Sequence, residues 1–280
     1  MTTLELTLPV PEPLHDLCVA ALTVWGFDGF AEDGDVLRAY APQDAWTDAA
    51  RAGVGAWLVA HELGPIAAER SIPHANWNAD YEATIRPIAV PPFLVRPSWA
   101  AFDAHAHAGL IDLVVEPKMS FGTGYHESTR LVLRLLPRLV RAGDAVLDAG
   151  CGTGILALAA LKLGAARAVA FDIDEWADEN AAENFARNGV ADRAEVRIGG
   201  IETVPETGFD LVLANIHREV LLELLPDLAA RLRPGGRLAL AGLLTSDAAT
   251  MRAAAGDAGF TRIDEATENA WWAWAGEKAA

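Results

Sequence analysis

Short, continuously apolar runs alternate with helical segments through the second half of the chain, and this alternation restricts the fold more than any other feature. Strands that are apolar on both faces are typical of a parallel sheet covered by helices on each side. The predicted strands are 145–150, 167–173, 209–216 and 237–244, and the predicted helices are 128–140, 153–165, 175–189, 218–232 and 246–258. We therefore predict an α/β domain with a mostly parallel sheet, which the segment WWAWAG at 271–276 ends as antiparallel strands.

A smaller unit precedes this domain. Its predicted elements are a strand at 4–8, a helix over 11–25, a hairpin over 29–42, a helix over 43–60 and a strand over 66–71. Asp33-Gly34 is the predicted turn of the hairpin. The order β-α-β-β-α-β predicts a small ferredoxin-like α+β domain, a unit that by itself names no function.

Proline divides the two units. Prolines recur between residues 71 and 117, where we expect a connector followed by short strands at 93–97 and 111–117. The predicted organisation is thus an N-terminal domain over 1–71, a linker with strands over 72–117 and a catalytic domain over 118–280.

The composition of the chain indicates its cellular location and the kind of partner that it binds. The formal net charge is −17, from 22 basic and 39 acidic side chains, so the surface repels nucleic acid and attracts a basic protein. Acidity that serves only solubility is an equal alternative. No apolar run is long enough to span a membrane, and we see no secretory signal. Cys18 and Cys151 fit no metal-ligand spacing, so we expect no metal and a cytoplasmic location.

A glycine loop joins the predicted strand 145–150 to the helix that follows. It reads Asp148-Ala-Gly150-Cys-Gly152-Thr-Gly154, and glycines at such a turn let a ligand approach the backbone and the helix N-terminus. The third glycine comes one residue earlier than in the dinucleotide fingerprint G-x-G-x-x-G. This spacing, with an acidic residue before it, resembles the S-adenosylmethionine loop of class I methyltransferases. Asp148 would oppose a pyrophosphate but suits a ligand that carries an amino group and a sulfonium.

Two polar side chains follow neighbouring strands of the predicted sheet. Asp172 lies 22 residues beyond Gly150, where a carboxylate accepts hydrogen bonds from an adenosine ribose. Asp174 is the predicted cap of the next helix. Asn215 ends the strand 209–216, and its carboxamide can hold an amine over the ligand crevice, although an Asn that caps the next helix is the alternative.

A second glycine-containing loop, EPKMSFGTGYHESTR at 116–130, lies just upstream of the first. If helix 128–140 packs beside the first strand, residues 120–129 cover the ligand opposite Gly150–Gly154. Thr129 would then supply a hydroxyl to the ligand. His126 could transfer a proton or hold the loop, and we favour the structural role.

Six motifs in one order extend the resemblance to a specific family. They are FGTGYHEST, LDAGCGTGILALAALKLGA, FDID, NFARNGV, ANI and LRPGG, and the segment at 76–99 is also similar. Over residues 76–278 the chain resembles the PrmA family, the methyltransferases of ribosomal large-subunit protein eleven. The resemblance implies a Rossmann-like class I methyltransferase domain that uses S-adenosylmethionine to methylate α-amino and lysine ε-amino groups of that basic protein.

The resemblance also carries site residues across. Thr129, Gly150, Asp172 and Asn215 fall on donor-contacting positions, with Gly152 in the same loop. Phe121 and His126 fall in the loop next to the acceptor. We therefore predict Asn215 and His126 as catalytic, and Thr129, Gly150, Gly152, Asp172 and Asn215 as cofactor-binding.

Two departures from the family pattern concern the acceptor. The family has Thr-His-Pro-Thr-Thr where this chain has Tyr125-His126-Glu127-Ser128-Thr129, and it has smaller or apolar residues where this chain has His217-Arg218. They leave open a methyltransferase for another protein amine or a small molecule. A nicotinamide-dependent oxidoreductase is the further alternative, against which the glycine spacing argues, and a non-catalytic binding module is the last. We expect a monomer.

Overall fold

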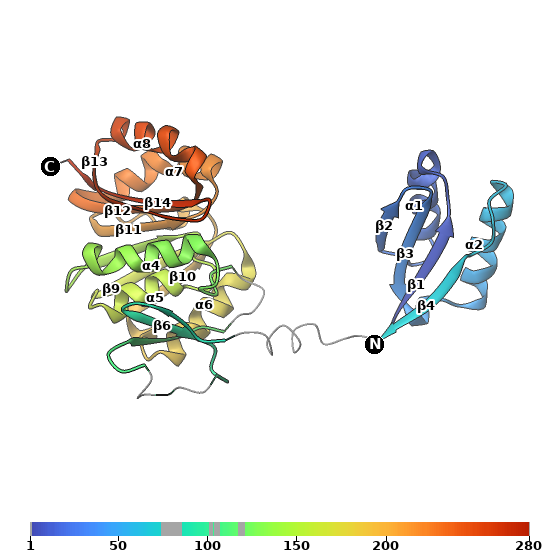
Figure 1. Ribbon diagram of the computed structural model, residues 1–280, viewed down its shortest axis with the longest axis horizontal. Helices are drawn as coiled ribbons and strands as arrows, with labels where there is room; N and C mark the ends of the chain where they lie inside the picture. The colour runs from blue at the N-terminus through green and yellow to red at the C-terminus, as the bar shows by residue number, and fades with distance from the viewer. Residues whose placement is uncertain (1, 74–85, 101–102, 104–106, 117–120, 280) are drawn as a thin grey trace. The chain divides into compact units, whose positions relative to one another are not determined.

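The structure is a computed structural model that describes residues 2–73, 86–100, 103, 107–116 and 121–279. The chain divides into two compact units, residues 1–84 and 85–280, each with its own core (Figure 1). All predicted site residues lie in the second unit, and the predicted domain boundaries at 71 and 117 remain predictions. Residues 74–85 and 117–120 lie outside the described residues, and with them parts of the predicted connector and of the second glycine loop.

The N-terminal unit has the predicted β-α-β-β-α-β order. Its elements are β1 (Thr2–Pro9), α1 (His15–Thr23), β2 (Gly29–Asp33), β3 (Val36–Pro42), α2 (Asp48–Ala60) and β4 (Ala68–Pro73), with short 3-10 turns at Glu12–Leu14 and Gln43–Ala45. The antiparallel sheet has the order β2-β3-β1-β4. This is the arrangement of the ferredoxin-like sandwich, so the predicted α+β domain is confirmed.

The hairpin turn is one residue further along than predicted. Asp33 pairs with Val36, so the turn residues are Gly34 and Asp35 instead of Asp33 and Gly34. Gly34 has φ +57°, a backbone conformation that aspartate adopts less readily than glycine. The glycine therefore takes the first central position of the turn, and Asp33 stays in the strand.

Alternation along β1 and β3 builds the core of this unit. Leu4, Leu6 and Leu8 on β1 and Leu37 on β3 face α1 and α2 and are nearly inaccessible to solvent. The intervening residues of these strands are partly exposed. This is the period-2 pattern of a sheet with one covered face.

The second unit contains the predicted mostly parallel sheet. Its strands are β8 (Ala145–Ala149), β9 (Arg167–Asp172), β10 (Ala194–Ile198), β11 (Phe209–Asn215), β12 (Leu232–Leu244), β13 (Phe260–Glu268) and β14 (Trp271–Lys278). They lie in the order β10-β9-β8-β11-β12-β14-β13. Pairs among β8 to β12 are parallel, whereas β14 is antiparallel to both β12 and β13, as predicted for the tail.

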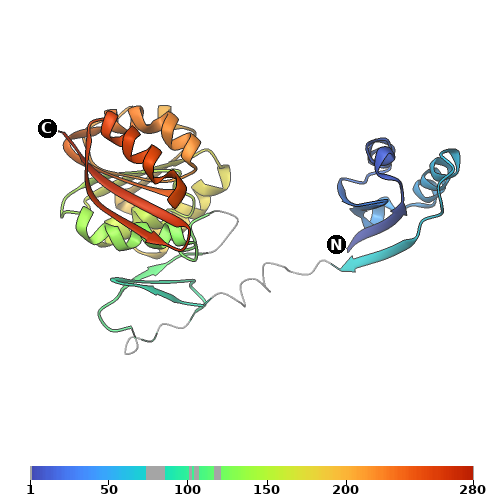
Figure 2. The same ribbon diagram turned by 45° about the horizontal axis from the view of Figure 1, so that its top comes forward.

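Helices cover both faces of this sheet. They are α4 (Glu127–Leu139), α5 (Ile155–Lys162), α6 (Glu175–Arg187), α7 (Arg218–Arg231) and α8 (Ala248–Asp257). One core cluster joins one face of the sheet to α4, α5 and α6, and a second joins the other face to α7 and α8 (Figures 1 and 2). The continuous apolar runs of β8, β9 and β11 are therefore buried on both sides, which explains their composition.

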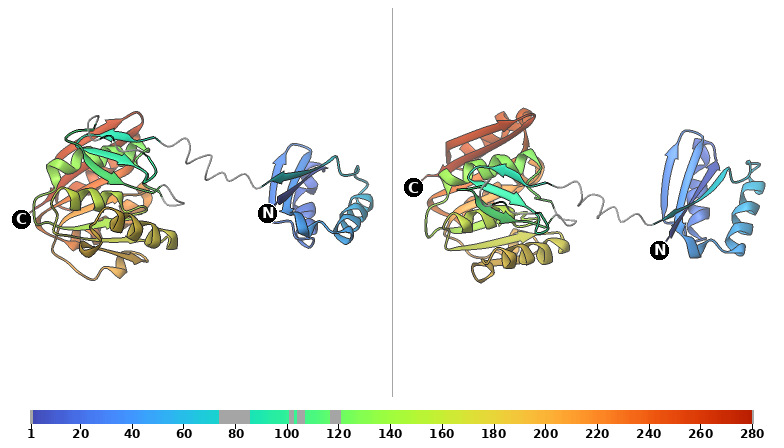
Figure 3. Two further views of the ribbon diagram at one scale, coloured as in Figure 1. Left: turned by 90° about the horizontal axis from the view of Figure 1, so that it is seen from below. Right: turned by 60° about the horizontal axis from the view of Figure 1, so that its bottom comes forward.

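A three-stranded sheet lies beside the large one. It consists of β5 (Ile88–Val90), β6 (Phe93–Arg96) and β7 (Ile111–Val114), with β5 antiparallel and β7 parallel to β6. Phe93, Val95 and Leu113 join the core cluster of α4 and α5, and the strands lie against these helices (Figure 3). This small sheet carries the chain into the segment that precedes α4.

Two features of the fold are not apparent from the sequence patterns above. The edge strand β10 has charged residues at Glu195 and Arg197, and its apolar positions are too few to mark it. Short 3-10 turns occur at Ala191–Arg193, Ile201–Thr203 and Thr245–Asp247. Within the part of the chain that the structure describes, no helix is both long and apolar enough to cross a membrane.

Candidate active site

A cavity of about 600 Å³ opens at the carboxyl ends of the parallel strands. The neighbouring strands β9, β8 and β11 end there in Asp172, the glycine loop and Asn215, respectively. The chain leaves β8 toward β9 on one side and returns as β11 on the other, which makes this edge a topological switch point. Its volume lies within the range of about 300–1,000 Å³ that is usual for small-molecule sites.

The glycine loop forms one wall of the cavity through its backbone. Gly150, Gly152 and Gly154 have φ values of +67°, +50° and +75°, which side-chain-bearing residues rarely adopt. A Cβ atom on Gly150 would lie 2.3 Å from Ile216 Cγ2, and one on Gly152 would lie 2.2 Å from the Phe121 carbonyl oxygen. Gly150 and Gly152 line the cavity, so a larger side chain at either position would alter its wall.

Asp148 supports this wall from beneath. It is fully buried and is not among the residues that line the cavity, and its Oδ2 accepts a hydrogen bond from Ala157 N of α5 at 3.0 Å. Burial raises the pKa of this carboxyl to about 7, with the Asp172 carboxylate adding to the effect. Its Oδ1 is buried without a hydrogen-bond partner among the described residues, and contact between Asp148 and a ligand amino group stays a prediction.

Asp172 lies at the cavity wall and is oriented by the backbone. Its Oδ2 accepts from Gly152 N at 2.8 Å, and its Oδ1 accepts from Asp174 N at 3.0 Å. Each carboxylate oxygen has a second lone pair available, so the side chain can still accept a hydroxyl. The next acidic residue, Asp174, caps α6 by accepting from Trp176 N, as predicted.

Asn215 lines the same cavity and is held by Thr129. Its Nδ2 donates to Thr129 Oγ1 at 3.3 Å, whereas its Oδ1 is buried and has no hydrogen-bond partner among the described residues. The N-cap of α7 is His217, which removes helix capping as the explanation for Asn215. A buried acceptor without a partner is costly, and a ligand N–H or O–H would satisfy it.

Thr129 occupies a different place from the one that the sequence suggested. Its side chain is fully buried behind Asn215 and does not line the cavity, where the adjacent Ser128 lies instead. Direct contact of Thr129 with a ligand stays a prediction. What the structure brings together is the pair of Thr129 and Asn215, from α4 and β11.

The second glycine loop packs against the first. Thr153 N donates to Phe121 O at 2.8 Å, and Thr153 Oγ1 donates to Gly122 O at 2.6 Å. Gly122 has φ +104°, and a Cβ there would lie 2.8 Å from Thr153 Oγ1. The predicted closeness of the two loops is thus present for residues 121 and onward. It places the Phe121 side chain, 55% exposed, at the cavity wall.

His126 is held firmly at the start of α4. It is the N-cap residue, and its Nδ1 accepts from Ser128 N at 3.2 Å and lies 2.8 Å from Ser128 Oγ. The ring packs edge to face between Phe121 and Trp271, at centroid distances of 5.2 and 4.3 Å. These contacts favour the structural role of His126 over proton transfer.

The residues that depart from the family pattern are mostly engaged in local contacts. Glu127 Oε1 accepts from Asn269 Nδ2 at 2.9 Å, and Tyr125 forms hydrogen bonds with the Arg86 backbone. Arg218 forms ion pairs with Asp247 and Glu219. His217 differs, because it lines the cavity, is exposed, and its side chain has no polar partner among the described residues.

Several cavity residues were not predicted from the sequence. Trp271 contributes an aromatic wall from the start of β14, which pairs with Leu244 at the carboxyl end of β12. Gly242, at φ +79°, lets the Ile216 backbone approach, since a Cβ there would lie 2.5 Å from Ile216 O. A glycine inside a predicted strand is a known sign of such close approach. The residues near Gly200–Glu202 had no comparable signal.

Comparisons with known proteins identify the family of this chain. The sequence model of the family described as ribosomal protein L11 methyltransferase (PrmA) matches residues 32–279. A relative of that name from Chlorobaculum tepidum is 36% identical over 96% of this chain and 94% of its own length. One from Thermus thermophilus is 41% identical over 70% of this chain and 75% of its own length. The crystal structure of ribosomal protein L11 methylase from Lactobacillus delbrueckii, 26% identical, matches with a TM-score of 0.65 over 70% of this chain and 100% of that one.

Proposed function

The chain belongs to the ribosomal protein L11 methyltransferase (PrmA) family, and from this premise we propose that it transfers methyl groups from S-adenosylmethionine to amines of ribosomal protein L11. The acceptors are the N-terminal α-amino group and lysine ε-amino groups. Membership of this family excludes the nicotinamide-dependent oxidoreductase that the glycine loop alone left open.

One observation carries the proposal. The glycine loop, Asp172 and Asn215 come from three adjacent strands, and the structure gathers all of them around a single cavity. The loop offers close backbone approach, Asp172 offers a carboxylate to a diol, and Asn215 offers a buried acceptor without a partner. A nucleoside that carries a cationic amino-acid tail meets these groups in turn.

The residues present fit S-adenosylmethionine. Gly150 and Gly152 present bare backbone to the cavity at positions where a Cβ would collide with Ile216 or with the Phe121 carbonyl, and Asp172 would hold the ribose hydroxyls. When bound, the donor supplies an electrophilic methyl group on a sulfonium sulfur. Ser128 lies on the cavity wall beside Thr129, and one of these two hydroxyls would contact the donor.

The acceptor amine must be neutral to act as a nucleophile, yet a lysine has a pKa near 10.4 and an α-amine near 8. Phe121 and Trp271 give the cavity apolar aromatic walls, and an acceptor protein that covers this opening would exclude water and favour the neutral amine. Asn215 Oδ1 would accept one N–H of this amine and so direct its lone pair to the methyl group, with Thr129 fixing the carboxamide. Positioning, and not a strong base, supplies most of the acceleration.

The partner and setting follow from charge and family. A net charge of −17 attracts a basic ribosomal protein and disfavours direct binding of nucleic acid. We propose that the chain works as a monomer in the cytoplasm. We further propose that residues 1–71 recognise the protein substrate and that residues 118–280 carry the transferase, joined through residues 72–117.

Intact-mass spectrometry tests this function. The protein is incubated with S-adenosylmethionine and unmethylated L11, free and in ribosomes, with Asp172→Ala as the control. We expect mass increments of one methylene each that are lost in the control. Donor binding without any increment on L11 would overturn the acceptor assignment and direct the search to other amines or small molecules.

A further inference from the structure

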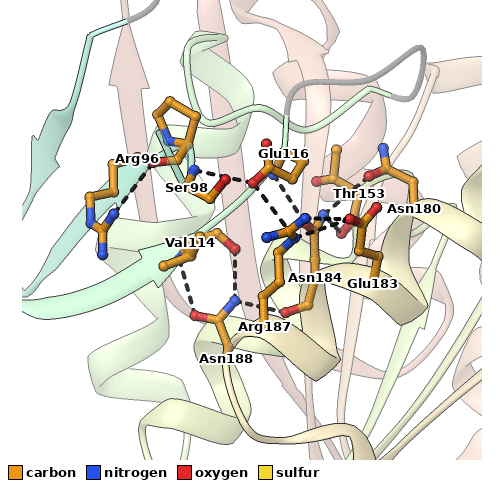
Figure 4. A network of polar contacts seen from close by, with 11 residues as sticks. Arg96, Ser98, Val114, Glu116, Thr153, Asn180, Glu183, Asn184, Arg187 and Asn188 are labelled. Carbon is orange, nitrogen blue, oxygen red and sulfur yellow. Dashed lines mark hydrogen bonds and ion pairs between the residues drawn. The ribbon is translucent and has the colours of Figure 1, made fainter. Parts of the chain in front are cut away.

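The motif NFARNGV at 184–190 has no role in the mechanism above, yet its asparagines are among the most buried polar residues of the chain. Asn184 and Asn188 of this motif and Asn180 before it follow one another at four-residue intervals. Asn180 and Asn184 lie on α6 and Asn188 is its C-cap residue, and Asn180, Asn184 and Asn188 are 1%, 0% and 9% exposed. Residues spaced by four lie on one face of a helix. Figure 4 shows this face directed at the end of β7 and at Thr153.

Asn184 links two backbone segments that lie far apart in the sequence. Its Oδ1 accepts from Glu116 N at 2.9 Å, and its Nδ2 donates to Thr153 O at 2.9 Å (Figure 4). Glu116 is the first residue of the second glycine loop, and Thr153 belongs to the first loop. One carboxamide therefore gives a hydrogen-bond partner to the N–H group of Glu116 and to the carbonyl oxygen of Thr153. Buried backbone groups of this kind need such partners.

Thr153 continues the connection into the cavity wall. Its N–H and hydroxyl donate to Phe121 O and Gly122 O, so both of its donors and its carbonyl oxygen are engaged. Phe121 lines the cavity, whereas Thr153 and Asn184 do not. A bound methyl donor would therefore meet this series of contacts at Phe121, and not at Asn184 where the series begins.

We infer that Asn184 is a positioning residue, which acts through Thr153 to fix the acceptor-side loop at Phe121–Gly122 against the donor-side loop at Gly150–Gly154. Methyl transfer requires the nucleophile, the methyl group and the sulfur in line, so the spacing between these two loops sets the reaction geometry. Donor affinity depends on Gly152, Asp172 and their neighbours and is largely independent of this link. The inference rests on the proposed function where its test measures the rate of methyl transfer.

Asn188 provides a matched control on the same helix face. Its side chain forms hydrogen bonds with Val114 N, Val114 O and Asn184 O, and none with the described residues of either glycine loop. The Asn188 side chain makes three hydrogen bonds, one buried and two partly buried, and the Asn184 side chain makes three buried ones when its contact with Asn180 Oδ1 is included. A variant at this position therefore reports the effect of lost stability alone.

The test compares Asn184→Ala with Asn188→Ala well below their unfolding temperatures. We expect the single-turnover rate with saturating S-adenosylmethionine and L11 to fall at least about tenfold in Asn184→Ala, because small misplacement of reacting groups is expensive. S-adenosylhomocysteine affinity, measured by calorimetry, should stay within about threefold, equivalent to ~0.7 kcal/mol. Asn188→Ala should keep its rate within about threefold while it loses as much thermal stability.

Variants of Thr153 sharpen the test. Thr153→Val removes the hydroxyl that donates to Gly122 O and should lower the rate, whereas Thr153→Ser keeps the hydroxyl and should restore it. Equal rate losses in Asn184→Ala and Asn188→Ala would overturn the inference, since the loss would then follow stability. A loss of donor affinity as large as the loss of rate would also overturn it.

Amide hydrogen exchange separates this inference from the proposed function. If the wild-type protein does not methylate L11, the function proposal is wrong, but the link between the loops can still be measured. Asn184→Ala should then speed exchange at Glu116 and along residues 121–126, and Asn188→Ala should leave residues 121–126 unchanged. Unchanged exchange at residues 121–126 in Asn184→Ala would contradict the inference whatever the substrate is.

Discussion

The floor and the rim of the cavity are built in different ways. The floor consists of Gly150, Gly152, Asp172 and Asn215, and it rests on the fully buried Asp148, Thr129 and Thr153. The rim consists of Phe121, Ile173, His217 and Val220, which are exposed, Ile173 to 81%.

This difference separates two tasks. Backbone conformation and burial fix the floor, so a change there must disturb the donor site or the fold beneath it. Residues of the rim are exposed and can be replaced without disturbing the fold. One of them is His217, where this chain departs from the family pattern. The proposed function assigns the methyl donor to Gly150, Gly152 and Asp172 of the floor and the reacting amine to Asn215 beside them, and leaves the rim to adjust access of the acceptor protein.

The largest effect is expected for the carboxyl under the floor. Because burial raises the pKa of Asp148 to about 7, above the 3.8 of an unperturbed aspartate, the folded state binds this proton more tightly than the unfolded state. The free energy of unfolding should therefore decline as pH rises from about 4 to 7, by up to roughly 4 kcal/mol from this group.

Asp148→Asn tests that expectation by urea unfolding across this pH range. The variant should match the wild type near pH 4, because an amide and a protonated carboxyl are both neutral, and should become the more stable protein by pH 7. Parallel pH profiles for the two proteins would show that Asp148 is ionised without penalty and that the floor is less enclosed than described.

Gly152→Ala should be the next most damaging change. Its Cβ would lie 2.2 Å from the Phe121 carbonyl oxygen, so the Gly152 backbone, which lines the cavity and donates to Asp172 Oδ2, must shift. We expect donor affinity by calorimetry to fall more than about 100-fold, equivalent to ~2.7 kcal/mol.

Gly189→Ala is the matched control for backbone strain. Gly189 has φ +67° against +50° for Gly152, but a Cβ there meets nothing within 4 Å. This variant should cost about 1 kcal/mol of stability and leave donor affinity unchanged. Similar donor affinities in the two variants would mean that the glycine loop is not the donor site.

Asn215→Ala should affect the reaction more than donor binding. Removing the buried acceptor that orients the amine should lower the single-turnover rate about 30-fold, equivalent to ~2 kcal/mol. Thr129→Val, which leaves the carboxamide without its anchor, should lower the rate by a smaller factor. A normal rate in Asn215→Ala would remove Asn215 from the mechanism.

The smallest effect is expected at the rim. His217→Leu should change the KM for L11 by no more than about threefold, ~0.7 kcal/mol, and leave donor affinity unchanged, because the side chain is exposed and makes no polar contact among the described residues. Steady-state kinetics with varied L11 measures this. A tenfold loss of donor affinity would break the distinction between rim and floor.

The floor was also the more predictable of the two regions. The strand ends, the glycine spacing and the acidic residue at the end of β9 are local sequence patterns. From them we predicted Gly150, Gly152, Asp172 and Asn215, and all four line the cavity. The order of helices and strands followed from apolar periodicity for the same reason. Element boundaries differed by a few residues, and β10 was missed because its edge position allows charged residues.

Other features depend on tertiary contacts that a local pattern does not contain. Trp271 reaches the cavity only because β14 pairs antiparallel to β12, and Thr129 turns inward to Asn215 instead of toward the cavity. Asp148 was expected near a ligand, but the first turns of α5 cover it. In each case packing between elements, and not residue type, determined the place of the side chain.

A crystal structure of the protein with S-adenosylhomocysteine, the product of the donor, tests the central claim most directly. The account predicts ribose hydroxyls on Asp172, the amino-acid tail along the glycine loop, and the sulfur directed toward Asn215 and Phe121. Product bound away from Asp172 and Asn215 would contradict the assignment of this cavity to methyl transfer.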